Sequence, residues 1–220
     1  MNRFAVCVSR KLGTLLLAIS AVSHAPFAAA ASATSPSLDP HSGMVATCAE
    51  CHGAAGEGSA AAGIPRLAGQ NADYMAHALS MFKAGTRASP AMQAIARNLS
   101  DSDMRALSDY FAAQKPPLAA ATQPPQQADV QRGQQLAQLG DGANVAACFS
   151  CHAAGGKGNG ARFPSIAGQP ATFTVARLHE FQERAKHGKP KPGSMTAVAA
   201  QMSDAQIEAA AAYLSTLSTN

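Results

Sequence analysis

Two short cysteine motifs hold the residue types best suited to chemistry in this chain of 220 residues. The first is CAECH, from Cys48 to His52, and the second is CFSCH, from Cys148 to His152. Two thiols three positions apart, followed directly by an imidazole, can bind a metal ion, cycle as a disulfide or hold a haem. The elements around the motifs decide among these three chemistries.

The motifs belong to a chain that is written twice. The segment IPRLAGQ, from Ile64 to Gln70, returns as FPSIAGQ, from Phe163 to Gln169. The segment NLSDSDMRALSDYF, from Asn98 to Phe111, returns as QMSDAQIEAAAAYL, from Gln201 to Leu214. The repeated segments follow the two cysteine motifs in the same order and at nearly the same distances, so each motif belongs to its own copy of the repeat.

The repeat sets the domain boundaries. Residues 116–127 lie between the copies and are rich in proline and glutamine, which is typical of an extended linker. We therefore predict a first domain at residues 34–115 and a second at residues 128–220.

Both copies show the spacing of amphipathic helices, and no run of residues alternates as a strand would. Ser100 and Ser203 are predicted N-caps of the last helix of each copy, with Gln206 completing a capping box in the second. The sequence thus predicts an all-α protein with glycine-rich loops after each motif. The apolar helix faces are Tyr74, Met75, Ala78, Leu79 and Phe82 in the first copy, and Phe173, Leu178 and Phe181 in the second.

The first 33 residues are typical of a secretory signal peptide. Arg3, Arg10 and Lys11 precede an apolar run from Leu12 to Val22, which is short for a membrane span. A retained membrane anchor is the alternative. We expect the mature chain to work in a bacterial periplasm, as a soluble protein or one associated with the membrane periphery.

Removing the signal changes the charge and the cysteine count. The formal charge falls from +4 to +1, so nucleic acid is not a supported partner. Cys7 is lost, and the four remaining cysteines all lie in the two motifs. Two disulfides would be ordinary in an exported protein, but a stabilising disulfide normally closes a longer loop.

The spacing and setting of the two motifs favour a haem over a zinc ion or a redox-active dithiol. A structural zinc site needs four ligands, commonly from two CxxC pairs close in sequence, whereas 96 residues separate Cys51 from Cys148. A thioredoxin-like dithiol expects a βαβ setting, which is not predicted here. A c-type haem needs two thiols that reach its two vinyl groups and an imidazole for its iron. The sequence therefore predicts two covalent haem c groups, anchored by Cys48 and Cys51 and by Cys148 and Cys151, with His52 and His152 as iron ligands.

The second axial ligand separates electron transfer from gas or peroxide chemistry. Met92 lies seven residues before Leu99, and Met195 lies seven residues before Met202, at the same point of each repeat. Both precede the capped terminal helix, where a loop can place the sulfur over the ring. Met92 and Met195 are therefore the predicted sulfur ligands.

Other methionines and histidines have no such match between the copies. His77 aligns with Ala176, and His179 aligns with Ser80. We expect packing or solvated roles for these two histidines, and also for His41, His187, Met44, Met75, Met81 and Met104.

Together these residues resemble the dihaem cytochrome c4 family, whose members are tandem class I cytochrome c domains in the bacterial periplasm. The resemblance covers the whole mature chain. It is carried by CAECHGAAGEG, PRLAGQ and MQAIARNLSDSDM in the first half, and by CFSCHAAGGKGNG, FPSIAGQP and MTAVAAQMSD in the second.

The resemblance implies further roles. Pro65 and Pro164 match the proline whose carbonyl accepts a hydrogen bond from the ligating histidine, although a loop-turning role fits the same position. Family members bring their haems close together at the domain interface. We expect a single-electron carrier, not an enzyme, between a quinol-oxidising complex as donor and a haem–copper oxidase as acceptor.

The second copy departs from the first by four extra residues between its helix and its methionine. Lys186, Lys189 and Lys191 lie there, in the half whose formal charge is +2 against −1 for the first. We hypothesise that these lysines steer an acidic redox partner toward the second haem. A solvated proline-rich loop is the alternative.

Two other functions remain open at this point. The chain resembles the tandem cytochrome subunit of a dedicated dehydrogenase, such as a flavoprotein sulfide dehydrogenase. A dihaem peroxidase would need one iron without methionine, and the matched pair Met92 and Met195 argues against it.

Overall fold

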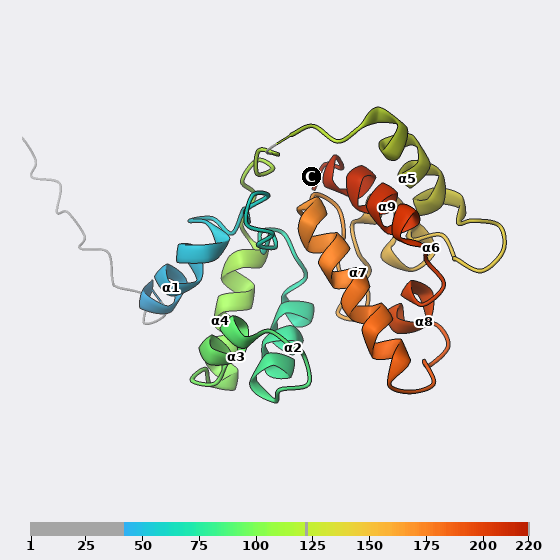
Figure 1. The fold of residues 1–220 in the computed structure, drawn as a ribbon. Helices are drawn as coiled ribbons and strands as arrows, with labels where there is room; N and C mark the ends of the chain where they lie inside the picture. The colour runs from blue at the N-terminus through green and yellow to red at the C-terminus, as the bar shows by residue number, and fades with distance from the viewer. Residues whose placement is uncertain (1–41, 122, 220) are drawn as a thin grey trace, which may run out of the picture. The chain divides into compact units, whose positions relative to one another are not determined.

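The computed structural model describes residues 42–121 and 123–219, and this part of the chain is helical (Figure 1). Its only β-structure consists of two isolated bridges, Ser59 with Ile64 and Asn159 with Phe163. The all-α prediction is therefore confirmed. The predicted signal segment at residues 1–33 and the loop residue His41 lie outside the described residues.

The first half contains four helices. The second helix packs against the fourth, and Leu99, Met104 and Leu107 form a buried core beside them. Met44 and Val45 of the first helix pack against this core. The helices are α1 (Ser42–His52), α2 (Ala72–Lys83), α3 (Pro90–Ala96) and α4 (Asp101–Ala112).

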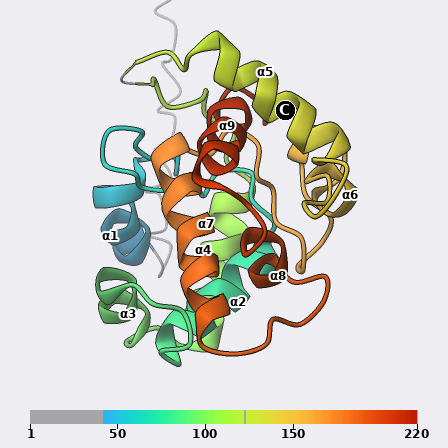
Figure 2. The same cartoon turned by 45° about the vertical axis from the view of Figure 1, so that its right-hand side comes forward.

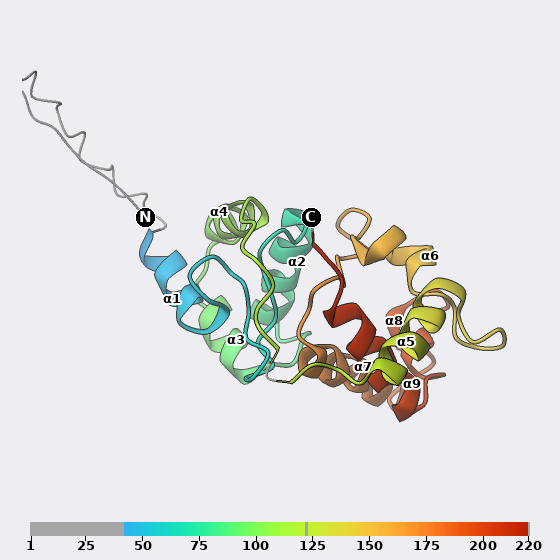
Figure 3. The ribbon, with the colours of Figure 1, turned by 90° about the horizontal axis from the view of Figure 1, so that it is seen from above.

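The second half repeats this order and adds a longer N-terminal helix. Its closest helix pair is the first and the last, which lie side by side in Figure 2 and Figure 3. The elements are α5 (Gln127–Leu139), α6 (Phe149–His152), the 3-10 helix η1 (Ala154–Gly156), α7 (Ala171–Lys186), α8 (Met195–Ala199) and α9 (Asp204–Ser215).

Both terminal helices begin at the predicted serine caps. The hydroxyl of Ser203 accepts a hydrogen bond from the Gln206 N–H at 3.3 Å, and the Gln206 side chain accepts from the Ser203 N–H at 2.8 Å. Ser100 and Asp103 form the same reciprocal box, at 3.1 and 2.8 Å. The capping box at Ser100 was not predicted from the sequence, because Asp103 has a shorter side chain than the usual Glu or Gln.

The two halves differ where the N-terminal helix meets the terminal helix. Tyr213 of α9 is 8% exposed and packs in a cluster with Val130 and Ala137 of α5. Its counterpart Tyr110 in α4 is 36% exposed. The first half therefore lacks the aromatic packing that the longer α5 provides in the second.

Two glutamines join the repeated AGQ segments of the halves. The Gln70 side chain donates to the Ser165 carbonyl and accepts from the Ser165 N–H, both at 2.9 Å. The Gln169 side chain donates to the Arg66 carbonyl and accepts from the Arg66 N–H, both at 3.0 Å. Arg66 and Ser165 occupy the same place in the repeat, so each half makes the same pair of hydrogen bonds to the other. We call these four hydrogen bonds the glutamine clasp.

Arg66 also fastens the linker to the first half. Its guanidinium donates to the carbonyls of Pro117 and Pro116, at 2.9 and 2.6 Å, and its Nε donates to the Ala68 carbonyl at 3.2 Å. The side chain is only 3% exposed, and burial lowers its pKa from the ordinary value. Backbone carbonyls therefore satisfy this buried cation, and the negative charge of Glu57 partly opposes the fall in its pKa.

Candidate haem-binding sites

The four motif cysteines lie at the C-terminal end of α1 and in the short α6 with its N-cap, and they form no disulfide. Cys48 and Cys148 are half-buried, and Cys51 and Cys151 are exposed. Burial raises the pKa of Cys48 and of Cys148 above the ordinary value. A redox-active dithiol needs the opposite shift, because its thiolate must form near neutral pH. Cys48 and Cys148 are therefore better suited to anchoring a group than to disulfide exchange.

The two motif histidines are buried and make the same contact. His52 Nδ1 lies 2.9 Å from the Pro65 carbonyl oxygen, and His152 Nδ1 lies 2.7 Å from the Pro164 carbonyl oxygen. A carbonyl can only accept, so Nδ1 must carry the proton, which leaves the Nε2 lone pair for a metal. Burial also lowers the pKa of both imidazoles, against the opposing effect of the carbonyls, and so favours their neutral, metal-binding form.

A glycine places each proline against its histidine. The N–H of Gly58 donates to the His52 carbonyl at 2.8 Å, and Gly58 has a φ of +80°. A Cβ on Gly58 would lie 2.7 Å from the Ile64 oxygen and 2.9 Å from the Pro65 carbonyl carbon. The loop can therefore return to the helix only because residue 58 has no side chain.

The second half builds the same loop with Gly158. Its N–H donates to the His152 carbonyl at 2.8 Å, and its φ is +87°. A Cβ there would lie 2.6 Å from the Ser165 nitrogen and 2.8 Å from the Pro164 carbonyl carbon. The repeat thus conveys backbone geometry as well as residue types.

A metal held by side chains alone does not fit these residues. Within residues 42–121 and 123–219, no three His, Cys, Asp or Glu side chains gather as a metal site would require. Each motif instead offers two thiols and one imidazole nitrogen. These groups fit a haem, which brings four nitrogen ligands of its own. The imidazole can bind its iron, and the two thiols can anchor its vinyl groups.

The predicted sulfur ligands lie at the N-termini of two short helices, and not in loops as expected. Met92 is the third residue of α3, and its N–H donates to the N-cap hydroxyl of Ser89 at 3.4 Å. Met195 is the first residue of α8, whose N-cap is Ser194. Both methionines are half-buried. Each is therefore placed by a serine-capped turn, which holds a side chain more firmly than an open loop.

The other methionines and histidines take ordinary positions. Met75 and Met104 are buried among the helices, as is Met202, which was expected to be an apolar packing residue because it matches Leu99 in the repeat. His77, His179 and His187 are exposed.

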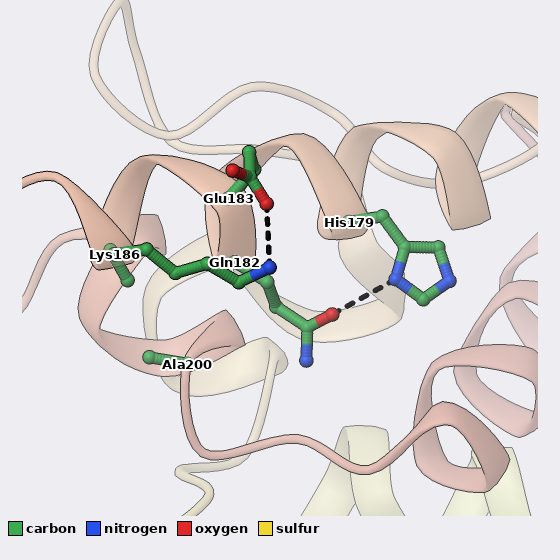
Figure 4. Close-up of a pocket in the computed structure, with 6 residues that line it drawn as sticks. His179, Gln182, Glu183, Lys186 and Ala200 are labelled. Atoms are coloured by element: carbon green, nitrogen blue, oxygen red, sulfur yellow. Dashed lines mark hydrogen bonds and ion pairs between the residues drawn. The ribbon is translucent and has the colours of Figure 1, made fainter.

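An open hollow beside α7 contains one of these histidines (Figure 4). His179 Nδ1 lies 2.9 Å from the Gln182 side-chain oxygen, and Lys186 Nζ lies 2.6 Å from Glu183. The contact with Lys186 lowers the pKa of Glu183. The hollow contains neither a motif cysteine nor a predicted iron ligand, so it is separate from the candidate haem sites.

The three docking candidates are not equivalent. Lys186 is the last residue of α7 and is paired with Glu183, which offsets its charge. Lys189 and Lys191 follow in the loop before α8, and both are exposed.

Gln70 and Gln169 are the residues near the site that sequence reasoning missed. Both are buried, at 6% and 7% exposed, and each contacts the peptide group that follows a histidine-binding proline. The repeated AGQ segment was visible in the sequence. A repeat shows that a residue is used twice, but it does not show what the side chain contacts.

Comparison with known proteins identifies the domains. A family model described as cytochrome c matches the chain twice, at residues 43–115 and 130–218. The chain belongs to the cytochrome c family. Both matches contain one CxxCH motif, so this cytochrome has two tandem domains.

The relatives of this cytochrome carry two kinds of name. Cytochrome c4 of Azotobacter vinelandii is 34% identical in an alignment that covers 94% of this chain and 98% of the relative. A thiosulfate dehydrogenase electron acceptor of Thiomonas intermedia is 38% identical over 170 residues, 77% of each chain. A solved structure of reduced cytochrome c4 from Pseudomonas stutzeri aligns with a TM-score of 0.68 at 32% identity, covering 80% of this chain and 95% of that one. The resemblance to dihaem cytochrome c4 is confirmed.

The cofactors follow from the family and the motifs. The cytochrome carries two covalent haem c groups, one at Cys48 and Cys51 and one at Cys148 and Cys151. It is a dihaem electron carrier and not itself an enzyme. None of the helices in residues 42–121 and 123–219 has the length and apolar character needed to cross a membrane.

Proposed function

We propose that His52 and Met92 are the axial ligands of the first haem iron, and His152 and Met195 those of the second. The observation that carries this proposal is the contact of each histidine Nδ1 with a proline carbonyl, because it leaves Nε2 free to bind iron. Pro65 and Pro164 then fix the orientation of each imidazole and raise its basicity. The matched places of Met92 and Met195, each just after a serine N-cap, support the sulfur ligands.

This ligand set determines the kind of chemistry. With a thioether from Met92 or Met195 as well as an imidazole, each haem would have a raised potential and would supply electron transfer rather than oxygen or peroxide chemistry. The protein supplies the ligands, the hydrogen bonds behind them and the buried surroundings, and the haem supplies the one-electron chemistry.

We place this carrier in a respiratory chain in the bacterial periplasm, after export by the N-terminal signal. It accepts electrons from a quinol-oxidising complex and delivers them to a haem–copper oxidase, in solution or at the membrane periphery. Such encounters use small, short-lived interfaces. Full-length similarity to a protein named cytochrome c4 supports this role.

A second candidate concerns the donor. A relative 38% identical to this chain is named as the electron acceptor of a thiosulfate dehydrogenase. This favours a dedicated dehydrogenase as the source of electrons, the class of alternative that the sequence left open. The oxidase side of the proposal is unchanged in this case.

Ferric spectra of Met92→Ala and Met195→Ala test the ligands. Each variant should lose about half of the sulfur-to-iron charge-transfer band, and the double variant should lose all of it. Met75→Ala, which changes a buried methionine of α2 that is not a predicted ligand, is the control and should keep the full band. If Met92→Ala and Met195→Ala both keep the band, the sulfur assignment is wrong.

Stopped-flow reduction tests the donor. The oxidised cytochrome is mixed with a quinol-oxidising complex plus quinol, and separately with a thiosulfate dehydrogenase plus thiosulfate. Rapid reduction by the first alone supports the respiratory shuttle, and rapid reduction by the second alone supports the dehydrogenase partner. Failure of both to reduce the protein would contradict both donors.

A further inference from the structure

The glutamine clasp does more than join the halves, because each glutamine binds a peptide group that also serves a histidine. Gln169 accepts from the N–H of Arg66, and that N–H shares a peptide group with the Pro65 carbonyl. The Pro65 carbonyl accepts from His52 at 2.9 Å. A side chain of the second half is therefore one peptide group away from a histidine of the first.

The reverse connection is also present. Gln70 accepts from the N–H of Ser165 at 2.9 Å, and that N–H shares a peptide group with the Pro164 carbonyl. The Pro164 carbonyl accepts from His152 at 2.7 Å. Each half thus reaches the histidine of the other half through one glutamine and one peptide group.

Hydrogen bonds in such a chain strengthen one another. A peptide group that donates through its N–H becomes a better acceptor at its carbonyl, because the two bonds polarise the group in the same sense. A better acceptor draws the Nδ1 proton away from the imidazole and makes the ring a stronger electron donor at Nε2. All four glutamine and histidine side chains are at most 7% exposed, so water does not compete strongly for these bonds.

We infer that the clasp gives crossed control of the two haems. Gln169 is a positioning residue for His52 and so sets the potential of the haem at Cys48 and Cys51 (haem 1). Gln70 is a positioning residue for His152 and sets the potential of the haem at Cys148 and Cys151 (haem 2). This inference rests on the proposed ligation by His52 and His152.

The two connections differ in one detail. The Gln70 side-chain oxygen accepts a second hydrogen bond, from the N–H of Asn71 at 3.0 Å. The residue after Gln169 is Pro170, which has no N–H to give. Gln169 therefore polarises its peptide group with an undivided acceptor, and its effect on haem 1 is the larger of the two.

The experiment replaces each glutamine by an apolar side chain of similar length and measures both haems in one protein. In Gln169→Met, haem 1 should favour reduction, with its oxidised-to-reduced ratio falling about two- to fivefold at a fixed potential. That is about 20–40 mV at 59 mV per tenfold for one electron. Haem 2 should not move. In Gln70→Met, haem 2 should shift in the same direction by less, and haem 1 should not move.

Paramagnetic NMR during a redox titration follows the two haems separately, after Met92→Ala and Met195→Ala have assigned their signals. In the reduced protein, the Nδ1 proton of the affected histidine should move to the position of a weaker hydrogen bond. Gln201→Met, a change at an exposed residue in the turn before α9, is the control and should shift neither haem.

Three results would overturn crossed control. They are a shift of the haem in the same half as the substitution, an equal shift of both haems, and no shift at all. Gln169→Glu separates the two hydrogen bonds of Gln169, because it keeps a stronger acceptor for the Arg66 N–H but loses the donor to the Arg66 carbonyl. It should move haem 1 opposite to Gln169→Met, and a shift in the same direction would also overturn the inference. Failure of the ligation itself is distinguishable, since His52→Ala and His152→Ala would then leave the haem spectra unchanged.

Discussion

Gly133 in α5 lies directly against the backbone of Ala209 in α9. A Cβ on Gly133 would be 1.9 Å from the Ala209 carbonyl oxygen and 2.6 Å from its carbonyl carbon. The helices can approach this closely only because one of them has a hydrogen in place of a side chain. Leu136 and Ile207 are buried in a core cluster shared by these helices.

Gly133→Ala should therefore destabilise the second half. Alanine favours a helix over glycine, but here the methyl group would force α5 away from α9 and open the core between them. We expect a loss of about 2 kcal/mol or more in the free energy of unfolding, which is within the usual cost of overpacking a core. Denaturant unfolding, followed by circular dichroism and haem absorbance, measures it.

Gly43→Ala is the matched control for this substitution. Gly43 is also helical, in α1, and a Cβ there would meet no atom within 4 Å. Its replacement should leave stability unchanged or raise it by up to about 1 kcal/mol, as helix propensity predicts. Equal losses in the two variants would show that contact with Ala209 is not the cause.

Gly58→Ala should disturb the first haem site alone. The new Cβ would meet the Ile64 oxygen, the Pro65 carbonyl carbon and the Arg66 nitrogen at under 3.0 Å, and its φ of +80° is unfavourable for alanine. We expect the Pro65 carbonyl to move away from His52, with a loss of about 2 kcal/mol in stability. The Nδ1 proton resonance of His52 and thermal unfolding report the two effects.

Gly85→Ala separates strain from collision in that test. Gly85 has a φ of +73° but nothing within 4 Å of a Cβ. It should show only the backbone cost, about 1 kcal/mol, and leave the His52 proton in place. A displaced His52 proton in this variant would mean that the Gly58 result is not local.

Asp141 should contribute stability above about pH 4. Its carboxylate accepts from the N–H groups of Ala143, Val145 and Asn144, at 2.9, 2.8 and 2.9 Å, and these bonds lower its pKa, led by the one from Ala143. A folded pKa below the unfolded value near 3.9 means that the contribution is full above that value and is lost as the pH falls further. Asp141→Asn should thus be less stable than the wild type at pH 6, with the gap closing toward pH 3.

Glu208→Gln serves as the control for the acid titration. Glu208 is exposed on α9. Its replacement by glutamine removes the same charge as Asp141→Asn but does not affect the turn that Asp141 caps. Urea unfolding between pH 3 and pH 7 gives both curves. A constant gap between wild type and Asp141→Asn over that range would contradict the role of the ionised carboxylate.

Lys189 and Lys191 should carry the docking charge, and Lys186 should contribute little. Lys186 is paired with Glu183, whereas the loop lysines are exposed. Lys189→Ala with Lys191→Ala should slow electron transfer to an acidic oxidase partner about threefold at low ionic strength and flatten its salt dependence. Lys186→Ala should change the rate less. Stopped-flow oxidation at several ionic strengths measures the rate and its salt dependence in each variant. If neither changes in the double variant, the loop is only a solvated loop and has no role in docking.

The sequence was sufficient to predict most of the fold, since the helices depend on local signals. Ser100 and Ser203 cap their helices as expected, because a cap depends on residues only three positions apart. Met92 and Met195 were expected in loops but lie in short capped helices, because seven and five residues are too few to show a helical period. The histidine–proline contacts agree with what the resemblance implied.

The contacts between the halves could not be predicted in the same way. Gln70 and Ser165 are 95 residues apart, and Gln169 and Arg66 are 103 apart. No local pattern specifies which distant backbone group a buried amide will meet. The structure was needed to show that the AGQ repeat marks an interface.

The reciprocity of the clasp has a consequence for how the chain is built. When residue i of one body contacts residue j of another, and j of the first contacts i of the second, the interface is isologous, as in a twofold homodimer. One such domain already presents both sides of the contact on a single surface. Joining two by a linker makes their pairing intramolecular and independent of protein concentration. It also allows the two copies to diverge. Arg66 donates hydrogen bonds to the linker, whereas the matching residue of the second copy is Ser165. The molecule is in this sense a dimer fused into one polypeptide.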